Sequence, residues 1–128
     1  MKLLLISLVA VLLLFGCTSQ PQQTTNNSSV NLSNGSGSVV EFQITAKNWD
    51  FTPNNITVNK GDRVRFVVTS MDVTHGITIP AFNVNLNIPA GTTKTVEFTA
   101  DKSGEYPFIC SVFCGEGHKN MKGTLTVK

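Results

Sequence analysis

Short apolar runs, separated by polar turn residues, fill the chain from residue 39 to its end, and none keeps a helical period over a useful length. The turn residues gather at 59–62, 89–91 and 101–104, where Gly, Pro, Asn and Asp interrupt the runs. Alternating or β-branched runs of this kind predict an all-β chain that folds as a Greek-key β-sandwich. The expected strands are 39–46, 56–58, 63–69, 76–79, 84–88, 93–99, 106–110 and 124–128.

Aromatic residues within these runs predict the core of the sandwich. Burial of one such side chain contributes about 1.5 to 3 kcal/mol. Tyr106 follows Gly104 and is interpreted as a structural tyrosine corner rather than a redox relay. Trp49 and Phe51 precede Pro53 in an expected break between strands, where a lid on the core is favoured over a point where electrons enter. The predicted core phenylalanines are Phe42, Phe66, Phe98 and Phe108.

The N-terminal region has a different pattern. An apolar stretch at 3–15 follows Lys2 and ends just before Cys17. It is shorter than the roughly twenty residues of a membrane-spanning helix, but it suits the apolar part of a signal peptide. The residues before Cys17 resemble the prokaryotic lipobox, whose cysteine is lipidated and becomes the mature N-terminus. The sequence therefore predicts a lipoprotein-type signal peptide at 1–16; an uncleaved N-terminal anchor is the alternative.

The segment that follows is rich in Ser, Thr, Asn and Gln and has no aromatic or charged residue at 18–38. Such a composition cannot bury enough surface to offset chain entropy. We expect residues 17–38 to be a lipidated cysteine with a flexible linker, and residues 39–128 to be one folded domain. Both the anchor and the alternative place this domain outside the cytoplasm, at the outer face of the cytoplasmic membrane or in the periplasm.

The charge of the expected domain argues against one class of partner. Residues 39–128 hold all eight acidic side chains and nine of the ten basic ones, a formal charge of +1 with no run of one sign. Nucleic acid is therefore not a supported partner. The near-neutral charge of this domain also argues against docking of a strongly basic protein by electrostatic steering.

Candidate chemistry is concentrated in residues 110–121. This segment contains two cysteines, His118 and Met121, and His75 is the other histidine of the chain. Thiolate and thioether sulfurs are soft ligands and imidazole is borderline, so these residues favour copper, and zinc less well, over oxygen-loving cations. If Cys17 is acylated, the remaining thiols of the three cysteines form the pair that a metal site needs.

Two motifs stand out, Asp72-Val-Thr-His75-Gly76 and Cys110-x3-Cys114-Gly115-x2-His118-x2-Met121. Together they resemble the dinuclear CuA domain of cytochrome c oxidase subunit II, a cupredoxin-type sandwich, over residues 42–128. The resemblance implies that Cys110 and Cys114 bridge two copper ions. It further implies that His75 and Met121 complete one ion, and that His118 and the backbone carbonyl of Val112 complete the other. Family members often carry Glu where this chain has Val112; because only the carbonyl binds, the difference is expected to shift the potential without preventing assembly.

Three other readings of these residues are possible. A mononuclear type 1 copper site would use His75, Cys114, His118 and Met121, but would leave Cys110 idle. A Cys2His2 zinc site would satisfy tetrahedral coordination but would leave the methionine unused. A disulfide between the two cysteines is the simplest expectation for an exported protein, and is expected for the metal-free form.

The favoured function is electron transfer by a membrane-tethered copper protein. Its donor and acceptor would be redox proteins, a cytochrome or a haem-copper oxidase. Protein atoms fill every coordination position, so no catalysis is expected from this chain alone. The alternative is a copper carrier or assembly factor for an oxidase, although such a carrier usually has more exposed methionine or histidine than this chain with its three methionines.

Overall fold

The computed structural model describes residues 39–128, so the predictions made for 1–38 lie outside it. Nine strands and two three-residue 3-10 helices make up this part of the chain, which confirms the all-β prediction. In the stretch from Val39 to Lys128, no helix is long and apolar enough to cross a membrane. The elements are β1 (Val39–Lys47), β2 (Asp50–Thr52), β3 (Asn55–Val58), β4 (Arg63–Ser70), β5 (His75–Ile79), η1 (Pro80–Phe82), β6 (Val84–Ile88), β7 (Thr93–Thr99), β8 (Gly104–Ile109), η2 (His118–Asn120) and β9 (Lys122–Val127).

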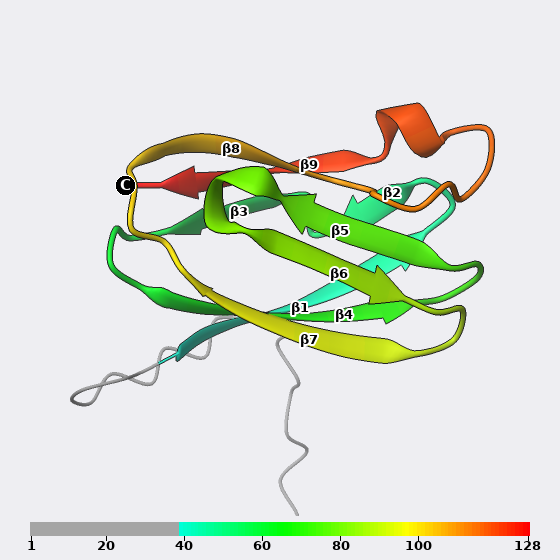
Figure 1. Cartoon of the computed structure of the whole chain (residues 1–128), viewed down its shortest axis with the longest axis horizontal. Helices are drawn as coiled ribbons and strands as arrows, with labels where there is room; N and C mark the ends of the chain where they lie inside the picture. Colours follow the sequence, from blue (N-terminus) through cyan, green and yellow to red (C-terminus); the bar gives the residue numbers. More distant parts are fainter. Residues whose placement is uncertain (1–38) are drawn as a thin grey trace, which may run out of the picture.

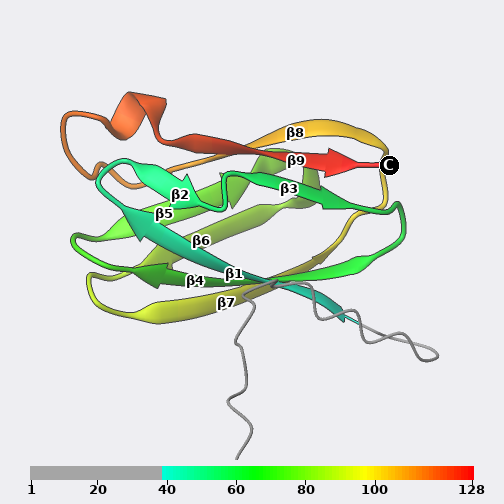
Figure 2. The same ribbon diagram turned by 180° about the vertical axis from the view of Figure 1, so that it is seen from behind.

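The strands form two stacked sheets (Figures 1 and 2). One sheet has the order β2-β1-β4-β7 and the other has the order β3-β9-β8-β5-β6. Two neighbouring pairs, β1 with β4 and β3 with β9, run parallel, because the chain crosses between the sheets before it returns. The remaining pairs are antiparallel. This is the two-layer sandwich that the sequence predicts.

The expected strands agree with the observed ones to within two residues at each end, with one exception. The assignment of Phe51 to a break between strands is wrong, because Asp50–Thr52 forms β2 and pairs antiparallel with β1, whereas Trp49 does lie in the turn between β1 and β2. Phe51 faces inward, is fully buried and contacts Phe108, with 5.4 Å between ring centroids. Three residues with one apolar side chain are too few to produce a recognisable alternation. Phe51 is therefore a core residue, whereas Trp49 remains 39% exposed.

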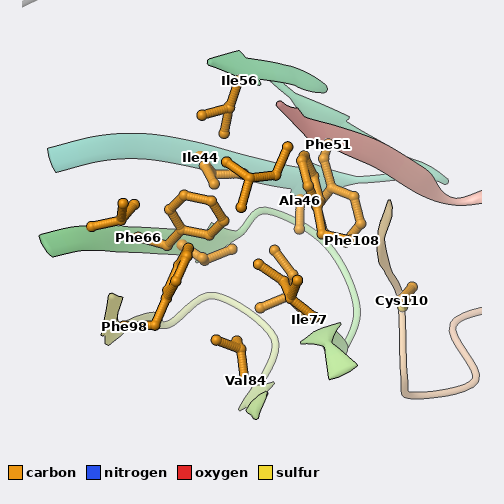
Figure 3. Packing of buried hydrophobic residues seen from close by; sticks show 14 of the residues in the cluster. Ile44, Ala46, Phe51, Ile56, Phe66, Ile77, Val84, Phe98, Phe108 and Cys110 are labelled. Atoms are coloured by element: carbon orange, nitrogen blue, oxygen red, sulfur yellow. The ribbon is translucent and has the colours of Figure 1, made fainter. Parts of the chain in front are cut away.

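Phenylalanines link the two sheets through the core (Figure 3). The Phe66 ring makes edge contacts with Phe98 and Phe108, at centroid distances of 5.3 and 6.0 Å. These three are buried as predicted, but Phe42 is only half-buried and packs against the core from its margin. Cys110 lies at one edge of the cluster, beyond Phe108. The core therefore extends to the end of the sandwich where the candidate ligands gather.

The opposite end of the sandwich, residues 59–62, 100–106 and the C-terminus, is called the far end. Its turns are closed by backbone hydrogen bonds, such as those from Lys60 N to Lys128 O at 2.8 Å and from Gly61 N to Ala100 O at 2.8 Å. The Tyr106 hydroxyl donates to the Ser103 carbonyl at 3.1 Å, which confirms the tyrosine corner. Figure 1 shows the C-terminus at this end and the segment near residue 115 at the other.

Candidate metal centre

Strand pairing brings the candidate ligands together. His75 begins β5, Cys110 follows the last residue of β8, and Met121 precedes the first residue of β9. Strand β8 lies between the other two in its sheet, so the three residues meet at one edge of that sheet. The backbone N–H of Cys110 donates to the Met121 carbonyl at 3.0 Å. The segment between them, 111–120, loops out and returns through η2, which carries His118.

The two thiols form the middle of the cluster. Both cysteines within residues 39–128 are free, and their Sγ atoms are 3.6 Å apart. Nδ1 of His75 lies 3.9 Å from Cys110 Sγ, and the Val112 carbonyl oxygen lies 3.2 Å from the same sulfur. The ligand atoms of His75, Cys110 and Cys114 all lie within 4.8 Å of one another, an arrangement that could hold a metal ion.

The other two candidate ligands adjoin the second thiol. Nδ1 of His118 lies 3.6 Å from Cys114 Sγ, and Sδ of Met121 lies 3.7 Å from it. Together with the previous contacts, each thiol therefore has one imidazole and one further donor beside it. The structure thus brings together all six side chains or carbonyls that the sequence predicts, although their role as ligands remains a prediction. Cys17, the predicted lipidation site, lies outside the described residues.

Most of these donors are shielded from water. His75 is completely buried, and Cys110, Cys114 and Met121 are buried as well. His118 is half-buried. A buried site whose donors are soft sulfur and imidazole nitrogen suits copper better than Ca²⁺ or Mg²⁺, which prefer oxygen ligands.

Asp72 orients His75, a role that the sequence reasoning did not assign. Its Oδ1 lies 2.7 Å from Nε2 of His75. A carboxylate only accepts hydrogen bonds, so Nε2 carries the proton and the lone pair of Nδ1 faces the sulfurs. Burial acts to raise the pKa of Asp72, but hydrogen bonds from His75 and from the N–H groups of Val73 and Asn48 outweigh it and lower the pKa. An aspartate three residues before a histidine in a turn was the available sequence signal.

The Cys114 thiol is disfavoured as a thiolate without a cation. Burial raises the pKa of Cys114 to about 11, and the adjacent Cys110 adds to the rise. Removal of a thiolate from water, next to a second sulfur, destabilises its charged form. A bound metal ion reverses this preference, because it stabilises the deprotonated sulfur directly.

The turn between β1 and β2 also reaches the ligand segment. Trp49 Nε1 donates to the Cys114 carbonyl at 3.2 Å. No sequence pattern indicated this contact, because the two residues are 65 positions apart. We call the segments 48–49, 71–75 and 110–121 the metal end of the sandwich.

Exposed apolar side chains surround the metal end. Four of the five large hydrophobic residues that are exposed within 39–128 belong to it: Trp49, Met71, Val73 and Phe113. Phe113 is 79% exposed, and its ring centroid lies 5.6 Å from that of His118. Exposed apolar residues that cluster in one region, rather than occurring singly over the surface, are typical of an interaction surface.

Comparisons with known proteins agree with this geometry. The chain is 42% identical over 78 residues to cytochrome c oxidase subunit 2 of Thermus thermophilus, a match that covers 61% of this chain and 58% of that protein. It is 33% identical over 96 residues to nitrous-oxide reductase of Cupriavidus necator, covering 72% of this chain and 15% of the reductase. A chain in the cryo-EM structure of a heme-copper terminal oxidase dimer superposes with a TM-score of 0.63 at 31% identity, over 69% of this chain and 64% of that chain.

These matches confirm the resemblance to oxidase subunit II that the ligand pattern predicts. The match spans little more than half the length of the Thermus relative and a small part of the reductase. A family model described as a cupredoxin-like domain matches residues 5–127. This chain therefore belongs to the family of cupredoxin-like domains.

Proposed function

We propose that this chain is an extracytoplasmic copper protein that carries single electrons through a dinuclear CuA centre. The observation that carries the proposal is the pair of buried free thiols, 3.6 Å apart, with one imidazole beside each. The similarity to oxidase subunit 2 and to nitrous-oxide reductase supports copper-based electron transfer.

The residues of the metal end fit two copper ions. Cys110 and Cys114 would bridge the ions through their thiolates. His75 and Met121 would complete one ion, and His118 with the Val112 carbonyl would complete the other. When bound, copper supplies one-electron redox chemistry. The protein holds the donors in place, fixes the tautomer of His75 through Asp72 and keeps water from the sulfurs by burial.

The arrangement favours a relay over an enzyme or a mononuclear site. The proposed protein donors would occupy the coordination positions of both ions and leave none open for a substrate, in contrast to catalytic metal sites. A type 1 copper site or a zinc site would leave one of the sulfur donors unused. Cys110 argues against the type 1 alternative, because it is buried and its sulfur lies beside both His75 and Cys114. Its position favours a bridging role.

The partner is proposed to be a redox protein, either a cytochrome or a haem-copper oxidase. The apolar surroundings of the metal end and the near-neutral charge of the domain fit docking through apolar contact better than docking through charge. We further propose that Cys17 carries a lipid anchor, and that residues 18–38 tether the domain at the outer face of a membrane. This part of the proposal rests on the sequence alone.

Metal content and electron paramagnetic resonance test the centre. Protein loaded with excess Cu(II) and a reductant, then reoxidised, should contain two copper ions per chain. One unpaired electron shared by both ions gives a seven-line copper hyperfine pattern. A single bound copper with four lines, together with alkylation of Cys110 in the loaded protein, would contradict the dinuclear assignment and favour the type 1 site.

Retention of copper separates a relay from a carrier. A relay keeps both ions through the redox cycle, whereas a carrier releases copper to its client. Reduced protein should therefore retain its copper during dialysis against a modest Cu(I) chelator. Loss of the metal within minutes would favour the copper carrier or assembly factor.

The anchor requires a separate experiment in the native host. A lipidated protein should partition into the detergent phase and carry fatty acyl mass on Cys17. A Cys17→Ser variant should not be processed at this site, while its copper domain folds unchanged. Soluble, unacylated wild-type protein would contradict the anchor without affecting the copper assignment.

A further inference from the structure

The two-residue turn between β1 and β2 has an unusual backbone. Lys47 and Asp50 form the last pair of the hairpin, and the residues between them have positive φ angles, 20° for Asn48 and 113° for Trp49. Glycine is the usual residue at the second position of such turns, and a bulky side chain there is uncommon. Strained residues of this kind persist only where their surroundings hold them, and they cluster at functional sites.

Hydrogen bonds attach this turn to both histidine-bearing segments of the metal end. Asn48 N donates to Oδ2 of Asp72 at 2.8 Å, while Oδ1 of the same carboxylate lies 2.7 Å from Nε2 of His75. On the other side, the indole N–H of Trp49 donates to the Cys114 carbonyl at 3.2 Å. One turn therefore connects His75 on β5 with the loop that contains the second cysteine.

Two glycines make room for the indole. A Cβ atom at Gly117 would lie 2.5 Å from both Cγ and Cδ2 of Trp49, and a Cβ at Gly115 would lie 2.9 Å from Nε1. Distances below 3.0 Å are not tolerated without movement. Gly117 has φ −85°, which any residue can adopt, so space alone requires glycine there. The indole thus lies directly on the backbone of residues 115–117.

This backbone also leads into His118. His118 N donates to the Gly115 carbonyl at 3.1 Å, so the position of residue 115 helps to fix the start of η2. A displacement of the 114–117 backbone would therefore move Cys114 and His118 together. The strand-borne donors His75 and Cys110 would remain in place.

We infer that Trp49 is a positioning residue, whose indole fixes the 114–118 segment and with it Cys114 and His118 as metal ligands. The inference rests on the proposed function for the identity of the metal, but not for the contact itself. Asp72 links the same turn to His75. The turn therefore sets the distance between His75, which lies on a strand, and Cys114 and His118, which lie on the loop.

The first test uses metal-free protein, with both thiols kept reduced, and a conservative variant. Trp49→Phe retains an aromatic ring but removes the N–H donor to the Cys114 carbonyl. Amide hydrogen exchange of residues 111–120 should become roughly fivefold faster or more, as expected for loss of one hydrogen bond. Exchange in β7 should not change.

Tyr106→Phe is the matched control. It removes one side-chain donor to a backbone carbonyl, that of Ser103, at the far end of the sandwich. In this variant, amide hydrogen exchange should become faster near residues 100–106 but not in 111–120. Equal acceleration of 111–120 in both variants would show a general loss of stability and would overturn the inference.

Gly117→Ala provides a second, independent test, because its methyl group would displace the indole while Trp49 is present. It should accelerate exchange in 111–120 by itself, but should add nothing in a Trp49→Ala background. Additive effects, or no effect of either Trp49→Phe or Gly117→Ala on 111–120, would overturn the inference.

The copper-loaded variants complete the test. Trp49→Phe should retain two copper ions but show altered hyperfine splitting and absorption bands, which Tyr106→Phe should not show. If Trp49→Phe left the spectra and the amide exchange unchanged but slowed electron transfer, the positioning role would be overturned. The indole would then act only as a path for electrons. One copper in the wild type would instead contradict the dinuclear centre, and the result in metal-free protein would be unaffected.

Discussion

At the metal end of the sandwich, the buried side chains carry the candidate ligands, and four large apolar side chains, Met71 and Phe113 among them, are exposed. At the far end, backbone hydrogen bonds and the Tyr106 hydroxyl close the turns, and charged residues such as Lys102 face water. The same two sheets support both ends. The difference indicates that the far end stabilises the fold, while the metal end uses that stability to hold sulfur and imidazole donors close together.

Within the metal end there is a second contrast. His75 and Cys110 lie on or directly beside strands, whereas Cys114 and His118 depend on a loop and a three-residue helix. The strand-borne donors are placed by sheet pairing. The loop-borne donors are placed by local contacts, such as the hydrogen bond from Trp49 to the Cys114 carbonyl. Substitutions should therefore affect the two groups differently.

Cys110→Ser should have the largest effect on the centre. The variant keeps His75, Cys114, His118 and Met121, the donor set of blue copper. Removal of one bridge should reduce the copper content from two ions to one and change the hyperfine pattern from seven lines to four. The domain should fold, since serine is close in size to cysteine. Two retained copper ions in this variant would show that Cys110 is not a bridge.

Phe108→Ala tests the sandwich that supports both ends. Phe108 is fully buried and contacts Phe51 and Phe66. Loss of a buried phenylalanine ring costs about 3 to 5 kcal/mol of unfolding free energy. Denaturant unfolding of the metal-free protein should show this loss. The folded fraction should still bind two copper ions, and a change of the spectrum without a loss of stability would contradict the division between the two ends.

His118→Ala should affect the metal more than the fold. The imidazole is half-buried, and its only side-chain hydrogen-bond contact among residues 39–128 is with Cys114. One ion would lose its nitrogen donor, so the hyperfine couplings of the two ions should become unequal. The unfolding free energy of the metal-free protein should change by less than about 1 kcal/mol.

His75→Ala is the matched comparison for His118→Ala. It would leave a cavity and deprive the Asp72 carboxylate of its ring partner, at a cost of about 1 to 3 kcal/mol. Equal stability losses in the two histidine variants would contradict the contrast between strand-borne and loop-borne ligands.

Sequence patterns were sufficient for the features that depend on many residues or on strong chemistry. Alternation gave the strands because each apolar run faces one core, and the soft ligands of 110–121 indicated copper by their donor types. The patterns did not predict features that depend on a single contact between residues far apart in the sequence. Strand β2 has only Phe51 as an apolar residue, and the link from Trp49 to Cys114 has no periodic signal. Asp72 was visible beside His75, but its hydrogen bond depends on the fold of the turn.

The smallest effect is expected for Glu97→Gln on the outer face of the four-stranded sheet. Glu97 accepts hydrogen bonds from Arg65 and Arg63, each at 2.7 Å, and the Arg65 hydrogen bond followed by that of Arg63 lowers the pKa of Glu97. The folded-state pKa lies below the unfolded value of about 4.3, so the stabilisation is present above that pH and is lost as the pH falls through the folded pKa. The partly exposed pairs are also screened by salt. Thermal unfolding of metal-free protein should therefore show a small difference between wild type and variant at pH 7 that diminishes as the pH falls below the unfolded value and then through the folded pKa. Copper content and hyperfine pattern should be identical in the two proteins, because Glu97 does not contact the metal end, and a spectral change would show that the two regions are coupled through the sheet.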